Sequence, residues 1–209
     1  MDLMVVQLMQ DKNLCYLEVY MNRDKMMVRL KSKISDKRFE HSLGVEYTAA
    51  CMAMVHGADV EKARLAGLLH DCAKGLPTSE KLEKARKHNI PVNKFEEKNP
   101  DMLHAKLGAF YARYKYDVTD EEILDAIRYH TTGRPNMSLL EKIIFVADYI
   151  EPNRKMVRDM EEIRKEAFLD IDQCVLHILK NTLEYLNSTT MDVDYTTQMT
   201  YNYYLNHVI

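Results

Sequence analysis

The sequence predicts an all-α protein, and three observations support this prediction. Strand-like alternation of apolar and polar residues is scarce, and the chain has only 6 glycines and 5 prolines with which to form turns. Residues that start and stop helices punctuate the apolar stretches. Apolar residues recur at helical spacing, most clearly at Ile171, Val175, Ile178, Leu179, Leu183 and Leu186.

The length of 209 residues suits one domain with modest appendages. We expect a helical extension over residues 1–30, a main domain over 31–190 and a tail over 191–209 that packs on the domain. The methionine-rich extension is interpreted as core, with an interface in a homodimer as the alternative.

Composition excludes several classes of protein. A net charge of -3 argues against a protein that coats nucleic acid polymers, but it leaves room for a cationic pocket. The cysteines form no CxxC motif, so reduced thiols in a cytoplasmic protein are expected. Asp2 stands where a signal peptide would carry positive charge, and no run approaches the roughly 18 apolar residues of a membrane span.

Capping residues predict where the helices begin and end. Residues 1–30 carry spaced apolar side chains and predict one or two helices. Ser35 should cap a helix with its body over 37–54, and Gly57 should end that helix. The remaining starts are expected at Asp59, at Thr78 or Ser79, at Thr119 with Glu122 as a capping box, and at Ser138.

The corresponding helices are expected over 59–69, 78–88, 101–114, 121–130, 138–150, 155–168 and 171–186. Residues 90–100 are expected to form a loop-rich connector. The last 22 residues are rich in Thr, Tyr and Asn, and they predict either a docked tail or a final short helix.

Four histidines and two aspartates carry the strongest functional signal. Asp71 follows the apolar run 65–69 and Asp148 lies within the apolar run 143–150, and neither run contains Lys or Arg. Because a buried carboxylate is destabilising unless a cation meets it, a metal ion is the simplest partner, with an ion pair between Asp148 and Arg154 as the structural alternative. Imidazole and carboxylate together suit zinc, manganese or iron. The pattern therefore indicates a metal-dependent hydrolase built from His41, His70, Asp71, His104, His130 and Asp148.

Other residues near these groups suit a phosphate ligand. His130 precedes a Thr-Thr-Gly-Arg loop, whose hydroxyls, backbone N–H groups and guanidinium can hold phosphate oxygens. Lys74 comes four residues after His70, so a continued turn would place it on the same face; the alternative is a solvated lysine. Tyr149 or Phe39 could stack on a base, and Phe39 could equally be a core residue.

Four stretches resemble, in this order, the HD superfamily of metal-dependent phosphohydrolases: 37–45, 69–75, 126–135 and 140–154. The most specific motifs are His-Thr-Thr-Gly-Arg-Pro and Ala-Asp-Tyr-Ile-Glu-Pro-Asn-Arg, which look most like the YqeK-type branch of symmetrical diadenosine tetraphosphate hydrolases. The resemblance implies an HD-domain helical bundle around a metal site. Asn136 departs from the glycine expected after Gly-Arg-Pro, at a turn position that Asn tolerates.

The resemblance also implies roles for single residues. The metal would be held by His41, His70, Asp71 and Asp148, with iron as the ion and manganese or cobalt as alternatives. Asp71, His104 and His130 would take part in catalysis, or His104 and His130 would instead complete a second metal position. Nucleotide contacts would fall on Arg38, Asp71, Cys72, Ala73, Lys74, His104, His130, Thr131, Asp148 and Arg154.

The implied reaction is symmetrical cleavage of diadenosine tetraphosphate to two ADP by metal-activated water. The same ligands would also serve an HD phosphohydrolase acting on nucleoside monophosphates, deoxynucleotides or a guanosine alarmone. A sensor that binds metal and nucleotide without turnover is a third hypothesis. Product analysis separates these hypotheses, because only the dinucleotide substrate gives two nucleoside diphosphates.

Overall fold

The computed structural model describes residues 23–189 and 192–208. Helices and turns account for these residues and no strand occurs among them, which confirms the all-α prediction. Residues 23–31 are helical. The helices that follow are α2 (Asp36–His56), α3 (Val60–Leu69), α4 (Thr78–Lys87), α5 (Lys94–Lys98), the 3-10 helix η1 (Pro100–Leu103), α6 (His104–Lys115), α7 (Glu121–Tyr129), α8 (Leu139–Ile150), α9 (Met160–Leu169), α10 (Ile171–Asn187) and α11 (Tyr195–His207).

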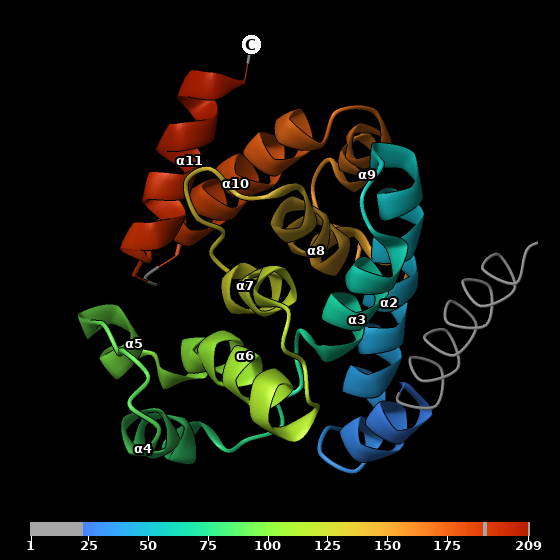
Figure 1. The fold of residues 1–209 in the computed structure, drawn as a ribbon. Helices are drawn as coiled ribbons and strands as arrows, with labels where there is room; N and C mark the ends of the chain where they lie inside the picture. Colours follow the sequence, from blue (N-terminus) through green and yellow to red (C-terminus); the bar gives the residue numbers. More distant parts are fainter. Residues whose placement is uncertain (1–22, 190–191, 209) are drawn as a thin grey trace, which may run out of the picture.

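Two helices, α7 and α8, lie in the middle of the molecule (Figure 1). Helices α2 and α3 pack together on one side of this pair, and α10 packs on α8 from the other side. Helix α6 packs on α7, and α4 lies against α6 and η1. This arrangement brings the ends of α3, α7 and α8 close to the second turn of α2, where the candidate site forms.

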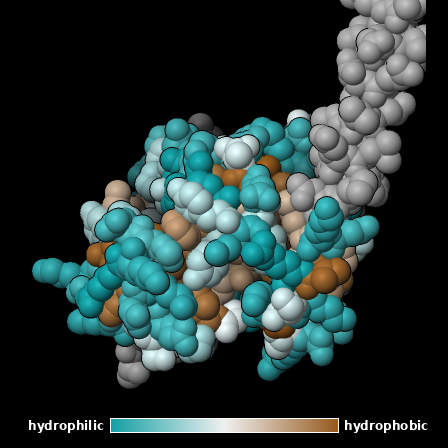
Figure 2. Space-filling view, turned by 60° about the horizontal axis from the view of Figure 1, so that its bottom comes forward, coloured by the Kyte–Doolittle hydropathy of each residue, from teal (hydrophilic) through white to brown (hydrophobic). Residues whose placement is uncertain are grey.

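The surface is mainly polar on the face that Figure 2 shows, where brown apolar patches are small and separated by hydrophilic side chains. Of the helices in the described parts of the chain, none is both long and apolar enough to cross a bilayer.

Most predicted caps are confirmed. Ser35 and Ser138 accept backbone N–H groups at the starts of α2 and α8, and Asp59 does so for α3. Gly57 ends α2 with φ of 74°, the left-handed conformation that favours glycine.

Two predicted caps are wrong. Helix α4 has Pro77 at its N-cap, so neither Thr78 nor Ser79 caps it. Helix α7 is capped by Asp120, which accepts the N–H of Glu122, one residue later than the predicted capping box at Thr119. In both cases the N-cap is a residue next to the predicted one. Helix starts that differ by one residue are similar in stability, so the exact N-cap is hard to predict.

The loop-rich connector contains more structure than expected. Asn93 and Glu96 form a capping box that starts the short helix α5, and η1 follows it. At the end of the chain, the final-helix alternative is confirmed: α11 packs on α10, with Thr200 and Tyr204 buried.

The proposed division at residues 30 and 190 stays a prediction. One or two helices were predicted over residues 1–30, and of these residues 1–22 lie outside the described part of the chain, while 23–30 are helical. Met26 and Leu30, which precede the proposed boundary, are buried in the same core as α2 and α8.

A close approach between α2 and α3 sets the distance between two site residues. The backbone of Gly67 in α3 lies against Glu46 and Val45 of α2, and a Cβ atom at position 67 would come within 2.9 Å of the Glu46 Cα. The carbonyl of Gly67 also accepts the Nδ1–H of His70. Glycine at position 67 therefore allows α3 to pack close enough to α2 for His70 to reach His41.

We expect Gly67→Ala to separate α2 from α3 and to lower the free energy of unfolding by about 1–3 kcal/mol, a usual cost of overpacking. The same variant should bind divalent metal less tightly. The measurements are chemical denaturation and a metal titration against a chelator.

The matched control is Gly57→Ala. A Cβ atom there meets nothing within 4 Å, but φ of 74° makes it strained, so stability should fall while metal affinity is kept. Equal metal affinity in both variants would contradict the role assigned to Gly67.

Candidate metal centre

The structure brings all six predicted residues of the metal pattern together where three helices end beside the second turn of α2. His41 lies in α2 and Asp148 in the last turn of α8. His70 and His130 occupy the C-cap positions of α3 and α7. Asp71 follows His70, and His104 opens α6. All except Asp148 are buried, and Asp148 is partly buried.

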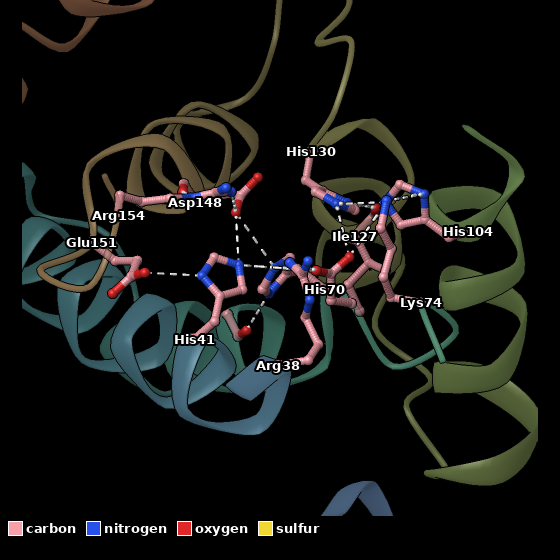
Figure 3. Close-up of polar contacts among 12 residues, drawn as sticks. Arg38, His41, His70, Lys74, His104, Ile127, His130, Asp148, Glu151 and Arg154 are labelled. Carbon is pink, nitrogen blue, oxygen red and sulfur yellow. Dashed lines mark hydrogen bonds and ion pairs between the residues drawn. The ribbon is translucent and has the colours of Figure 1, made fainter. Parts of the chain in front are cut away.

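Each of the four histidines has its Nδ1 tied to an acceptor outside the cluster, which leaves its Nε2 facing inward (Figure 3). Three of them donate to the carbonyl three residues earlier: His70 to Gly67 at 2.7 Å, His104 to Asp101 at 2.6 Å and His130 to Ile127 at 2.7 Å. The fourth, His41, instead donates to the Glu151 carboxylate at 3.0 Å. With Nδ1–H donated outward, each Nε2 presents a lone pair to the centre.

One half of the cluster surrounds His41. Its Nε2 lies 3.0 Å from Asp148 Oδ1, 3.2 Å from the Nε2 of His70 and 3.9 Å from Asp71 Oδ2. Two imidazole nitrogens with lone pairs gain little from facing each other at this distance. A cation between them and the two carboxylates satisfies all four groups.

The other half of the cluster surrounds Asp71 Oδ1. His104 Nε2 lies 3.3 Å and His130 Nε2 3.7 Å from this oxygen. The oxygen is buried and has no hydrogen-bond partner among the described residues. An orphaned carboxylate oxygen is costly in a protein interior unless a cation meets it. The donor set therefore fits a divalent metal, with Asp71 placed to serve either half.

Both carboxylates are held in the charged form. Burial raises the pKa of Asp71, but the neighbouring imidazoles of His70, His130 and His104 outweigh it and hold that pKa well below its usual range. Burial likewise raises the pKa of Asp148, but the neighbouring His41, His70 and Arg154 outweigh it and bring that pKa far below its usual range. A metal ligand must be deprotonated, so these shifts favour metal binding.

Burial also lowers the pKa of His104 to about 3, and the neighbouring His130 acts in the same direction. His104 is therefore a neutral imidazole at neutral pH. A neutral imidazole can bind a metal or accept a hydrogen bond, but it carries no proton on Nε2 to give away.

Two arginines extend the site. Arg38 Nη1 donates to Asp71 Oδ2 at 2.7 Å. Arg154 pairs with Asp148 through Nη2, and its Nε donates to the Asp148 carbonyl at 2.6 Å. The ion pair considered as the structural alternative for Asp148 thus coexists with the His41 contact on the same oxygen.

Lys74 lies beside His104, at one end of the cluster. Its Nζ lies 3.3 Å from His104 Nδ1 and 2.9 Å from Asp101 Oδ2. Asp101 also pairs with Lys81, a lysine of α4 that is only 1% exposed. Burial raises the pKa of Asp101, but the hydrogen bonds from Lys81 and Lys74 outweigh it and bring that pKa to about 2. One carboxylate thus meets two ammonium groups, and the trio keeps a net positive charge.

Other predicted contacts face elsewhere. The Cys72 thiol lies against the Gly108 carbonyl, and Ala73 packs with a small core cluster that includes Leu103, so any nucleotide contact of these two would use their backbone. Burial raises the pKa of the Cys72 thiol far above its usual range. Phe39 is buried in the core, which confirms the core alternative for that residue.

The remaining predicted contact, Thr131, lines a small crevice of about 50 Å³ with Lys106 and Thr196.

Sequence reasoning missed Glu151. This residue is 1% exposed, accepts the His41 Nδ1–H on Oε1 and accepts the Asn153 N–H on Oε2 at 2.7 Å. A Cβ atom at Gly44, one turn along α2 from His41, would collide with Oε2. The sequence contained a signal for Glu151. It lies between the apolar run 143–150 and Pro152, so, like Asp148, it is a carboxylate that needs a partner if it is buried.

We expect Glu151→Gln to weaken divalent-metal affinity by about 10- to 100-fold, the usual effect of removing a partner of a ligating histidine. The amide has one acceptor oxygen where the carboxylate has two, so the His41 or the Asn153 contact is lost. Competition with a chelator measures the affinity.

Glu166→Gln is the matched control, because Glu166 holds Nδ1 of His177 at 2.9 Å outside the cluster. If the two variants bind metal equally well, Glu151 does not position His41.

Comparisons with known proteins agree with this geometry. The HD domain family matches residues 38–153. The symmetrical bis(5'-nucleosyl)-tetraphosphatase of Bacillus subtilis is 41% identical over 88% of this chain and 97% of its own length. A protein of the same description from Staphylococcus aureus is 36% identical over 88% of this chain and 95% of its own length.

A solved structure has the same fold. The crystal structure of a predicted HD superfamily hydrolase involved in NAD metabolism from Clostridium acetobutylicum matches with a TM-score of 0.86 and 39% identity. The match covers 88% of this chain and 97% of that one. The family match spans more than half of the chain and contains all six residues of the histidine and aspartate cluster, and the chain therefore belongs to the HD domain family.

Proposed function

We propose that this chain hydrolyses diadenosine tetraphosphate symmetrically, giving two ADP, at a divalent metal centre. The observation that carries the proposal is the buried, unpartnered Oδ1 of Asp71 facing imidazole nitrogens, in a chain whose relatives include symmetrical tetraphosphatases. Iron is the ion we propose, with manganese or cobalt as alternatives.

The metal ligands we propose are His41, His70, Asp71 and Asp148. The distances around His41 support this set. For His104 and His130 two roles remain, a second metal position or proton donation to the leaving oxygen. The ligand atoms of Asp71, His104 and His130 lie within 4.8 Å of one another, and the low pKa of His104 leaves it neutral, which favours the second metal position.

A divalent metal bound here supplies Lewis acidity, which lowers the pKa of a bound water and offsets charge on phosphoryl oxygens. The reaction joins the water oxygen to a phosphorus next to the central bridging oxygen and breaks the bond between that phosphorus and the bridge. The bridging oxygen leaves with one ADP and takes up a proton, and the attacked phosphorus stays with the other ADP.

The protein's own groups hold the phosphates during this reaction. Lys74 and Arg154 lie at opposite ends of the cluster (Figure 3) and can contact phosphoryl oxygens on either side of the bond that breaks. Arg38 lies beside Asp71 and adds a third cation. The backbone of 71–74 and Thr131 adds polar groups at the Lys74 end.

We expect the wild-type protein, loaded with iron, manganese or cobalt, to convert diadenosine tetraphosphate to ADP alone and to lose this activity on chelation. His70→Ala should lose bound metal and activity while remaining helical. Anion-exchange analysis, metal analysis and circular dichroism provide the readouts.

His207→Ala removes an exposed histidine outside the cluster and is the control. AMP and ATP as products would refute symmetrical attack. Full activity of His70→Ala would refute the site.

We expect Lys74→Ala to lower kcat/KM for the dinucleotide by about 100-fold, the scale for removing one charge-stabilising donor. Bound metal should be unchanged, because Lys74 carries no lone pair for a metal when protonated. The control is Lys84→Ala, which removes a surface lysine of α4 paired with Glu80. Parallel loss of metal and activity in Lys74→Ala would instead make this lysine part of the metal site.

A further inference from the structure

A pocket opens at the His41 end of the cluster. Its volume is about 570 Å³, which lies within the 300–1,000 Å³ typical of small-molecule sites. His41 and Arg154 line both the pocket and the metal centre. A ligand held at the metal can therefore extend directly into this space, which we call the His41 pocket.

The charges around the His41 pocket suit phosphates. Four cations line it, Lys37, Arg38, Arg154 and Lys155, against the carboxylates of Glu40 and Glu151. Glu151 is buried and occupied by His41 and the Asn153 N–H.

Two of the four cations are free to meet a ligand. Lys37 and Lys155 are exposed, and neither has an ion-pair partner within residues 23–189 and 192–208. Arg38 and Arg154 already contact the site carboxylates, so they lie nearest the metal, with the two lysines farther out.

The pocket also has an apolar side that suits a nucleobase. Tyr149 is half-buried and forms part of the wall, and Met160 and Val157 line the same space. An aromatic side chain beside a cationic pocket wall is a common arrangement for holding a base next to its phosphates.

Two other cavities lie near residues that flank the cluster. One is the crevice of about 50 Å³ beside Thr131, and the other has a volume of about 460 Å³ and is lined by Cys72 and Gly75; none of the six cluster residues lines either of them. A symmetrical cut places one nucleoside diphosphate on each side of the metal, so the two halves must extend in opposite directions. One of these directions leads into the His41 pocket, a preformed cavity of nucleotide size that the cluster residue His41 itself lines.

We propose that the His41 pocket binds one nucleoside diphosphate half of the dinucleotide substrate. The base lies against Tyr149, and Lys37 and Lys155 face the phosphates or ribose on the outer side of Arg38 and Arg154. This inference rests on the proposed function, and it gives the pocket the role of selecting substrates with a second nucleoside. The metal ligands alone would accept any polyphosphate.

Two variants test the pocket. Lys37→Gln with Lys155→Gln removes its free cations, and Val157→Trp fills it from an exposed position. We expect KM for diadenosine tetraphosphate to rise at least tenfold in each variant, with bound metal and melting temperature unchanged. KM within twofold of wild type in both variants would overturn the proposal.

The matched control is Lys87→Gln with Lys180→Gln, which changes net charge equally at two exposed lysines outside the pocket. A rise in KM in this control as large as in the pocket variant would attribute the effect to overall charge, and the proposal would fail.

Calorimetric titration with ADP separates failure of the pocket from failure of the proposed function. If wild type cleaves no dinucleotide but Val157→Trp weakens ADP binding tenfold, the function is wrong and the pocket assignment holds. If wild type cleaves the dinucleotide and the variants change neither KM nor ADP binding, the pocket assignment is wrong and the function holds.

Discussion

The inward direction of four imidazole Nε2 atoms is the constraint on which the site depends. Imidazole can present either nitrogen, and the choice is made by whatever accepts a hydrogen bond from the other. His70, His104 and His130 lie at helix ends or a 3-10 junction, where the carbonyl three residues earlier is available as an acceptor. His41 lies within α2, where the backbone carbonyls already accept hydrogen bonds of the helix. The Glu151 carboxylate, at the end of α8, therefore accepts the Nδ1–H of His41. Helix ends thus supply three orientations without any further residue, and the fourth requires Glu151 together with the space left by Gly44.

The charges around the cluster follow from its burial. Asp71 and Asp148 remain ionised because imidazoles and arginines meet them, and the remaining unpartnered oxygen requires a cation. The same logic applies farther out, where Asp101 meets both Lys74 and Lys81. Lys81 is buried, and its ammonium group offsets the charge of Asp101. The positive charge of Lys74 is therefore not cancelled by Asp101 and can act on a ligand at the site. A lysine that faced an uncompensated carboxylate would be a weaker phosphate ligand.

Sequence reasoning predicted the parts of this molecule that depend on local patterns. Ser35, Asp59 and Ser138 cap helices as expected, because an N-cap is decided by a few neighbouring residues. Asp71 and Asp148 were identified because a carboxylate at an apolar run needs a cation, and the four histidines because imidazoles suit the same metal ion. Glu151, Asp101 and Gly67 were not identified, because their roles come from contacts across the fold. Gly67 matters only against Glu46, and Asp101 only against Lys81. The boundaries of α4 and α7 were missed by one residue, where adjacent residues compete for the cap.

The two ends of the cluster differ, and this difference bears on how a symmetrical substrate is cut. At the His41 end lie Arg38, Arg154 and a large pocket; at the His104 end lie Lys74, the Thr131 crevice and η1. A substrate whose halves are identical therefore meets unlike surroundings on its two sides. Binding energy from the larger pocket can hold one half still, so that the central bridge is placed at the metal and not a phosphate nearer the nucleoside. The bond that is cleaved would then be set by the number of phosphates between the base bound in the pocket and the metal. The metal ligands themselves would not need to recognise the middle of the polyphosphate bridge.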